Sequence, residues 1–449
     1  MENYYLQTNR KAVINVAFVG SRSSGKSTTI GHLLYSTGNI NQNFFEIRKR
    51  SARETYGEEY KYAWLLDNNW HECTYRKTLQ IHLKRLQTQK HDFNLIDLPG
   101  DFHLRKTIFK GLSLADAAVL IVSADSENDK NEHIKDDLIL AYTLGIRQLI
   151  LAFNKMDKTK DIKYSEKRFM QLKKQMLTLS KTVGFDINNI QFIPYSGYTG
   201  QNLVERYEDE SNGKLNKMEW YKGKTLLESL DELKSPKRDL DGPLKISIFY
   251  VDKISGIGTV LEGKILSGKL VKDMDIYVPT AKGIQKLKCN SIEIHYQTMP
   301  EAVAGDIIGF RVRGICRTEA YDHSRLVFSE SVFKTIQIAH NLRVKILMLN
   351  KNIALKAGSD LCMFCYTLKA AVKIRKIEYI IDDTNKILER EPKEIRNGGY
   401  VIMILDLKKN SYEIREHFFE KYMKNPILGS IALFNKDFIA VGSIQDINV

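Results

Sequence analysis

Long apolar runs are missing from this chain of 449 residues. No stretch reaches the roughly 18–20 apolar residues that a membrane-spanning helix needs. The first residues, Met1 to Tyr5, also lack the basic and then apolar order of a secretory signal. We therefore expect a protein without a membrane span that stays in the cytoplasm, the compartment in which it is made.

Cysteine is scarce, with five residues in the whole chain. An odd and sparse set of this kind does not favour a disulfide framework. Cys362 and Cys365 form a lone CxxC, and no second pair completes four zinc ligands. Because the pair lies in the apolar run from Leu361 to Leu368, we expect a buried strand with two small apolar thiols there.

Acidic residues are in the minority, and the formal net charge is +14. Such an excess favours an anionic partner such as RNA, an acidic protein surface or a cytoskeletal filament. A solvated lysine-rich surface explains the charge equally well. The composition is 43% hydrophobic and 27% charged, which is typical of folded globular proteins, and the length predicts two to four domains.

Strand-like and helix-like segments alternate in the first half of the chain, which predicts a parallel sheet covered on both faces. A polar linker with two prolines follows at 235–243, and short β-rich runs separated by glycine turns follow the linker. These runs predict all-β barrels. The predicted domains are an α/β domain at 1–235, a barrel at 240–330 and a second barrel at 333–449.

A phosphate-binding loop is predicted between the first strand (13–20) and the helix that begins near Ser27. The segment Gly20–Ser27 matches the pattern G-x-x-x-x-G-K-[ST]. Its backbone N–H groups can surround phosphates, Lys26 can reach the β and γ oxygens, and the Ser27 hydroxyl can bind Mg²⁺. The predicted binding residues of this segment are Gly20, Ser21, Arg22, Ser23, Ser24, Gly25, Lys26, Ser27 and the following Thr28.

Three further motifs follow later strands and predict a guanine-nucleotide site. Asp97 and Gly100, from Asp-Leu-Pro-Gly, can reach the magnesium shell and the γ-phosphate. Asp157, from Asn-Lys-Met-Asp, can accept hydrogen bonds from guanine N1 and N2, and adenine lacks the 2-amino donor. We therefore predict GTP or GDP with Mg²⁺ as ligands of a P-loop GTPase domain. The third motif is Ser196-Gly197-Tyr198, which can complete the base pocket, and the remaining predicted contacts are Asn154 and Lys155.

The chain resembles the elongation factor 1-alpha family over almost its whole length. The likeness is dense at Asn15–Phe18, Lys61–Trp64 and Ala141–Gly145, moderate at Gly256–Val260, and thin at Pro426–Gly429. It implies a GTPase domain followed by two β-barrels. It also implies GTP-dependent delivery of aminoacyl-tRNA to the ribosome, a guanine-nucleotide exchange factor, and a magnesium-binding threonine at Thr78.

Several positions depart from that family, among them Ser23, where the family has an aspartate, and three positions that concern hydrolysis. The resemblance places Asp101 where the family has the histidine that orients the attacking water, and Arg22 and Lys77 where it has two apolar residues. An anionic Asp101 would repel the γ-phosphate, so we predict slow hydrolysis. We also hypothesise that Arg22 or Lys77 forms an ion pair with Asp101. Sequence drift in a gene copy freed from translation is the alternative explanation.

Three functions are compatible with these residues. The first is a translation elongation GTPase that carries aminoacyl-tRNA, and the intact nucleotide motifs favour it. The second is a nucleotide-binding scaffold derived from such a factor, for example one bound to cytoskeletal filaments, and the altered positions favour it. The third is a termination or rescue GTPase that carries a protein shaped like tRNA. The sequence around Lys61–Trp64 and Tyr142–Gly145 is closer to the elongation factor. The third function is therefore the least favoured of the three.

Overall fold

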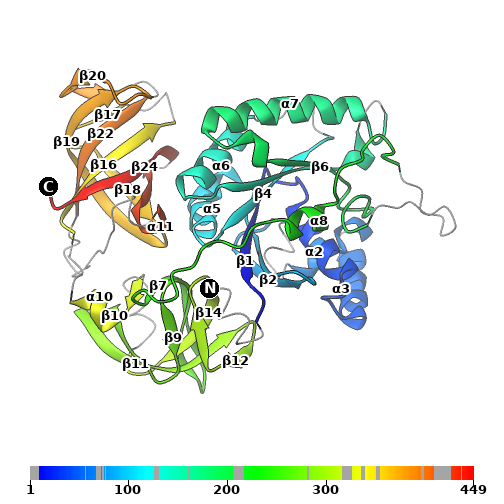
Figure 1. Cartoon of the computed structure of the whole chain (residues 1–449), viewed down its shortest axis with the longest axis horizontal. Helices are drawn as coiled ribbons and strands as arrows, with labels where there is room; N and C mark the ends of the chain where they lie inside the picture. The colour runs from blue at the N-terminus through cyan, green and yellow to red at the C-terminus, as the bar shows by residue number, and fades with distance from the viewer. Residues whose placement is uncertain are drawn as a thin grey trace. The chain divides into compact units, whose positions relative to one another are not determined.

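The computed structural model divides into two compact units, one built mainly from residues 2–236 and one from residues 237–449 (Figure 1). Each unit is considered by itself below. The structure describes residues 10–55, 57–66, 72, 75, 77–125, 131–159, 162–205, 217–280, 283–315, 326–334, 339–349, 354–395, 399–408, 426–435 and 437–449. Within these residues no helix is long and apolar enough to cross a membrane.

The first unit contains a six-stranded sheet in the order β2-β3-β1-β4-β5-β6. Five strands run parallel, and their side chains are mostly buried because helices cover both faces. The edge strand β2 runs antiparallel to β3, so the sheet is mostly rather than wholly parallel. The strands are β1 (Val13–Val19), β2 (His82–Gln87), β3 (Asp92–Asp97), β4 (Ala117–Ser123), β5 (Gln148–Asn154) and β6 (Gln191–Pro194).

Helices pack on both faces of this sheet (Figure 1). One buried cluster joins apolar residues of α2 and α8 to β1, β4 and β5, which places these two helices on the same face. The α-helices are α2 (Lys26–Ser36), α3 (Gln42–Thr55), α5 (Arg105–Leu112), α6 (Asn131–Thr143), α7 (Glu166–Val183) and α8 (Leu226–Asp231). Short 3₁₀ turns are η1 (Glu58–Tyr60), η2 (Ala63–Leu65), η3 (Phe102–Leu104), η4 (Met156–Lys158) and η5 (Ile187–Asn189).

Local sequence signals fix the ends of the longest helix, α7. The Ser165 hydroxyl accepts a hydrogen bond from the backbone N–H of Arg168, which satisfies one of the free donors of the first turn. Gly184 ends the helix with a φ of 109°, a conformation that favours glycine. Both ends of α7 are therefore set by residues next to the helix in the sequence.

The second unit begins with a closed barrel. Its strands run in the order β10-β15-β7-β8-β14-β11, and the β10–β11 pairing closes the ring. The strands are β7 (Lys245–Ile254), β8 (Gly258–Ser267), β10 (Asp275–Thr280), β11 (Gly283–Ile294), β14 (Ile307–Val312) and β15 (Leu326–Phe328). Outside the ring lie β9 (Lys269–Val271), β12 (Gln297–Met299), β13 (Glu301–Val303) and helix α10 (Glu330–Phe333).

A second closed barrel follows in the same unit. Its order is β18-β23-β24-β16-β22-β19, with β18 and β19 closing the ring. The strands are β16 (Asn341–Met348), β18 (Asp360–Cys365), β19 (Leu368–Ile381), β22 (Tyr400–Leu407), β23 (Ser430–Asn435) and β24 (Asp437–Ile447). Shorter elements are β17 (Leu355–Lys356), β20 (Ile387–Arg390), β21 (Glu394–Ile395) and helix α11 (Pro426–Gly429).

The two cysteines of the CxxC lie on a strand, β18, as predicted, but they are not both buried. Cys365 is fully buried and Cys362 is half-buried. Residues three apart in a strand face opposite sides, because the side-chain period is two. Neither of the two cysteines forms a disulfide among the described residues. The expectation of two buried thiols was therefore wrong for Cys362.

Candidate nucleotide site

The loop between β1 and α2 has a shape that only its glycines permit. Gly20 and Gly25 have φ angles of 139° and 97°. A Cβ atom on Gly20 would lie 2.3 Å from the Ile121 carbonyl oxygen, and one on Gly25 would lie 2.2 Å from the Asn154 amide nitrogen. The backbone therefore turns tightly against β4 and β5, and α2 begins directly after the turn.

The Lys26 ammonium lies across this loop. Its Nζ donates hydrogen bonds to the carbonyl oxygens of Gly20 at 2.8 Å and Ser21 at 3.0 Å. The side chain is buried, and burial lowers its pKa. Gly100 reaches the same place, since a Cβ atom there would lie 2.4 Å from Lys26 Nζ. The segment after β3 thus lies against the phosphate loop. A residue larger than glycine at position 100 would push this segment away from the loop.

Three side-chain oxygens from three segments meet beside Lys26. The Ser27 hydroxyl donates to Asp97 Oδ2 at 2.6 Å and lies 3.2 Å from the Thr78 hydroxyl. Asp97 is wholly buried, burial raises its pKa, and its Oδ1 has no hydrogen-bond partner among the described residues. Oxygen donors around an unsatisfied buried carboxylate fit a hard cation such as Mg²⁺.

Asn154 holds the other end of the site together. Its side-chain nitrogen donates to the Ser24 carbonyl at 2.8 Å, and its oxygen accepts from the backbone N–H of Gly197 at 2.8 Å and Lys155 at 2.7 Å. The side chain is only 2% exposed. It therefore fastens the phosphate loop to the loop after β6 and acts as a brace within the site.

A buried carboxylate oxygen without a partner also marks this end. Asp157 lies in η4, and its Oδ1 is buried with no hydrogen-bond partner among the described residues. The Tyr198 ring is 39% exposed, and the Lys61 ammonium lies 5.4 Å from its centre. An acceptor beside an exposed aromatic ring and a lysine can bind a flat donor-bearing base.

A cavity of about 470 Å³ connects these groups. Several predicted residues lie outside its lining. Gly20, Ser21 and Ser24 line a neighbouring cavity, Asp97 is hydrogen-bonded to Ser27, and Ser196 is fully buried in the loop after β6. The 470 Å³ cavity is also lined by Glu59, Tyr60 and Ala63, which were not predicted because no short motif marks them. Predicted residues in the lining are Arg22, Ser23, Gly25, Lys26, Ser27, Thr28, Thr78, Gly100, Asp101, Asn154, Lys155, Asp157 and Tyr198.

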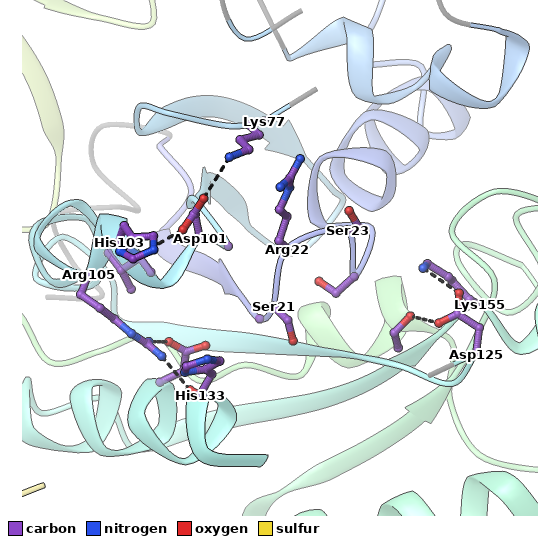
Figure 2. A pocket seen from close by; sticks show the side chains of 16 residues that line it. Ser21, Arg22, Ser23, Lys77, Asp101, His103, Arg105, Asp125, His133 and Lys155 are labelled. Carbon is purple, nitrogen blue, oxygen red and sulfur yellow. Dashed lines mark hydrogen bonds and ion pairs between the residues drawn. The ribbon is translucent and has the colours of Figure 1, made fainter. Parts of the chain in front are cut away.

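Figure 2 shows the side chains that line the neighbouring cavity, which has a volume of about 660 Å³. Arg22, Ser23, Lys77, Gly100, Asp101 and Lys155 line both cavities. We define the three altered positions Arg22, Lys77 and Asp101 as the gate residues. They lie where the two cavities adjoin.

The hypothesised ion pair at the gate is confirmed for Lys77. Its Nζ lies 3.3 Å from Asp101 Oδ2 (Figure 2). The backbone N–H of His103 donates to the other oxygen of Asp101 at 3.1 Å. This backbone hydrogen bond, followed by the Lys77 ammonium, holds the pKa of Asp101 below its usual value. Asp101 is therefore a charged carboxylate at neutral pH.

Comparison with known proteins decides the family. Residues 11–236 match the Elongation factor Tu GTP binding domain, and residues 341–445 match the GTP-eEF1A C-terminal domain-like family. Elongation factor 1-alpha of Tetrahymena pyriformis is 34% identical over 445 residues, covering 97% of this chain and 98% of the relative. The chain belongs to the elongation factor 1-alpha family. Its first unit is a GTPase domain, and guanine nucleotides are its ligands.

A second relative agrees with this assignment, and a solved structure shares the fold. Elongation factor 1-alpha of Plasmodium falciparum is 34% identical, covering 97% of this chain and 96% of the relative. The GTP-bound Ski7 GTPase-like domain of S. cerevisiae shares the fold, with a TM-score of 0.78 and 18% identity over 99% of each chain. The predicted fold class, a P-loop GTPase domain followed by two barrels, is confirmed.

Proposed function

We propose that the chain binds aminoacyl-tRNA in its Mg²⁺–GTP state, as a translation elongation factor with slowed hydrolysis. One observation carries the nucleotide part. A single cavity is lined by Ser27 and Thr78, with Asp97 hydrogen-bonded to Ser27, and by Asp157, whose buried Oδ1 has no hydrogen-bond partner among the described residues. Membership of the elongation factor 1-alpha family supports the tRNA and ribosome part, together with an exchange factor and a cytoplasmic location.

Each residue would have a distinct role in holding the nucleotide. Asp157 would accept hydrogen bonds from the guanine edge, and the loop N–H groups with Lys26 would bind the phosphates. Ser27 and Thr78 would hold the metal ion, and Asp97 would orient Ser27 through their 2.6 Å hydrogen bond. When bound, Mg²⁺ would neutralise charge on the β and γ oxygens.

Slowed hydrolysis is proposed because Asp101 is a poor group for positioning water at a phosphate. A carboxylate there carries the same charge sign as the γ-phosphate, and Lys77 holds it in an ion pair. The nucleotide-binding residues are unaffected by this change. We therefore expect tight GTP binding, slow intrinsic turnover and little stimulation by ribosomes.

Filter binding of labelled aminoacyl-tRNA tests the proposal. The purified chain is loaded with a nonhydrolysable GTP analogue or with GDP, and binding is measured at two salt concentrations, because phosphate contacts weaken with salt. Tight binding with the analogue alone supports the tRNA-carrying function. Bound nucleotide without tRNA binding in either state would contradict it.

The gate residues favour a second candidate, a GTP-binding scaffold without tRNA delivery. A paired Asp101 in place of the water-orienting histidine suits a chain that keeps its nucleotide. The net charge of +14 would suit an anionic partner such as a cytoskeletal filament. Co-sedimentation with actin filaments or microtubules tests it, and a chain that remains in the supernatant at low salt would contradict it.

A further inference from the structure

Arg22 occupies a place in the phosphate loop where its side chain is exposed beside the predicted phosphate positions. It lies four residues before Lys26, and both cavities share it as a lining residue. A Cβ atom on Gly100 would lie 2.7 Å from the Arg22 backbone nitrogen, so the segment after β3 comes close to this residue. Figure 2 shows the Arg22 side chain extending from the loop on the side where Lys77 and Asp101 lie.

The three carboxylates that line the larger cavity together with Arg22 already have other partners. Asp101 pairs with Lys77 at 3.3 Å, and Asp125 pairs with Lys155 at 2.8 Å. Asp137, on α6, pairs with Arg105. Among the described residues none forms a hydrogen bond or ion pair with the Arg22 side chain. An arginine therefore remains at the gate without an anionic partner.

An unpaired guanidinium at this place fits a phosphate group. Its planar donors can bind two oxygens of one phosphate at once, which a lysine ammonium cannot do with the same geometry. Lys26 already donates to two loop carbonyls, which leaves it one further donor for phosphate. A second cation that reaches only the outermost phosphate would distinguish a triphosphate from a diphosphate.

We propose that the Arg22 guanidinium binds the terminal phosphate of GTP and thereby makes this chain selective for GTP over GDP. The inference rests on the proposed nucleotide site and assigns a specificity-determining side chain within it. The Lys77–Asp101 ion pair supports this function indirectly, because it occupies Asp101, the carboxylate that lines both cavities together with Arg22. Without Lys77, Asp101 would be available to pair with Arg22 and to repel the terminal phosphate.

Equilibrium binding by the full chain tests this assignment. The affinities for a nonhydrolysable GTP analogue and for GDP are measured with Mg²⁺ for the wild type, Arg22→Val and Arg22→Lys. We expect Arg22→Val to lower the ratio of the two affinities about tenfold or more while GDP affinity changes little. The ratio for Arg22→Lys should lie between those of the wild type and Arg22→Val, since lysine keeps the charge and loses the planar donors. Arg53→Val, at an exposed arginine in the last turn of α3, is the matched control and should leave the ratio unchanged.

A double substitution adds a second test. Lys77→Ala should also lower the ratio, and Lys77→Ala with Asp101→Asn should restore it, but only while Arg22 is present. A wild-type ratio in Arg22→Val, or an equal fall in both affinities, would overturn the inference while leaving the nucleotide site intact. A wild-type chain that binds neither nucleotide would instead overturn the proposed function, and this inference with it.

Discussion

The two ends of the nucleotide cavity differ in how closely they follow the family pattern. At the base end, the positions of Asn154 and Asp157 carry the residues that the motif requires, and the Asn154 side chain makes three hydrogen bonds. At the gate, Arg22, Lys77 and Asp101 are all changed, and two of them form an ion pair. The difference indicates that binding of the nucleotide and triggering of its hydrolysis depend on separate groups in this chain.

Substitution of Asn154, the brace at the base end, should have the largest effect of the changes considered. Asn154→Ala would remove three hydrogen bonds from a buried position and leave the Gly197 N–H without its partner. We expect the free energy of unfolding of the first unit to fall by about 2–4 kcal/mol. Urea denaturation followed by circular dichroism measures it. The matched control is Asn188→Ala at an exposed turn, and an equal loss there would contradict the role of the brace.

Base recognition gives the next largest effect. Asp157→Asn would replace an acceptor by a group that presents a donor to the guanine edge, so we expect GTP affinity to fall about 100-fold. Xanthosine triphosphate, which carries an oxygen at the 2-position, should then bind better than GTP. Competition with a fluorescent nucleotide measures both. Asp241→Asn at an exposed linker position serves as the control, and unchanged GTP affinity in Asp157→Asn would remove Asp157 from the site.

The dependence of GTP affinity on Mg²⁺ tests whether the cation binds beside Lys26, at the phosphate end of the cavity. Ser27→Ala would remove the hydroxyl between Thr78 and Asp97. We expect the gain in GTP affinity that Mg²⁺ provides over EDTA to fall about tenfold, because one ligand is lost and Asp97 loses its partner. Ser21→Ala, in the same loop, should retain the Mg²⁺ effect. An unchanged Mg²⁺ effect in Ser27→Ala would place the cation elsewhere.

Breaking the gate ion pair should affect stability least. Lys77 and Asp101 have side chains 31% and 21% exposed, and partly exposed pairs contribute little. We expect Lys77→Ala to change the free energy of unfolding by less than about 1 kcal/mol, although it alters the ratio of GTP to GDP affinity. Thermal unfolding of Lys77→Ala without nucleotide measures this. A much larger loss would make the pair a structural element of the domain.

Acid should break the same pair only far below neutral pH. The pKa of Asp101 is lowered in the folded chain, so its contribution is present above its ordinary value of 3.8 and is lost as pH falls through the lowered value. Between pH 6 and 8 we expect no change in the ratio of GTP to GDP affinity that depends on Asp101. Comparing the wild type with Asp101→Asn across this range checks the expectation.

Sequence patterns predicted the buried strands and the phosphate loop well, because each follows from a strict physical requirement. Gly25 must adopt a left-handed conformation, and β1 is buried on both faces, so most of its residues are apolar. The ion pair of Lys77 with Asp101 was also predictable, since opposite charges had replaced neighbouring groups. The roles of the individual site residues remain predictions.

Other features left little trace in the sequence. Helix α3 buries only Phe45 and Ala52, so its apolar pattern is too weak to recognise. Edge strand β2 is polar and half-buried, which resembles a loop. Glu59 and Tyr60 reach the cavity through the course of the chain between α3 and η2, and no local motif encodes that path.

A single-turnover hydrolysis measurement tests the separation of binding from triggering most directly. The chain is loaded with GTP labelled at the γ-phosphate, and released phosphate is followed with and without ribosomes, beside Asp101→His. We expect the wild type to bind the labelled GTP tightly, to release phosphate slowly and to gain little from ribosomes. Rapid ribosome-stimulated release by the wild type would show that the changed gate still triggers hydrolysis, and would contradict the separation of binding from triggering.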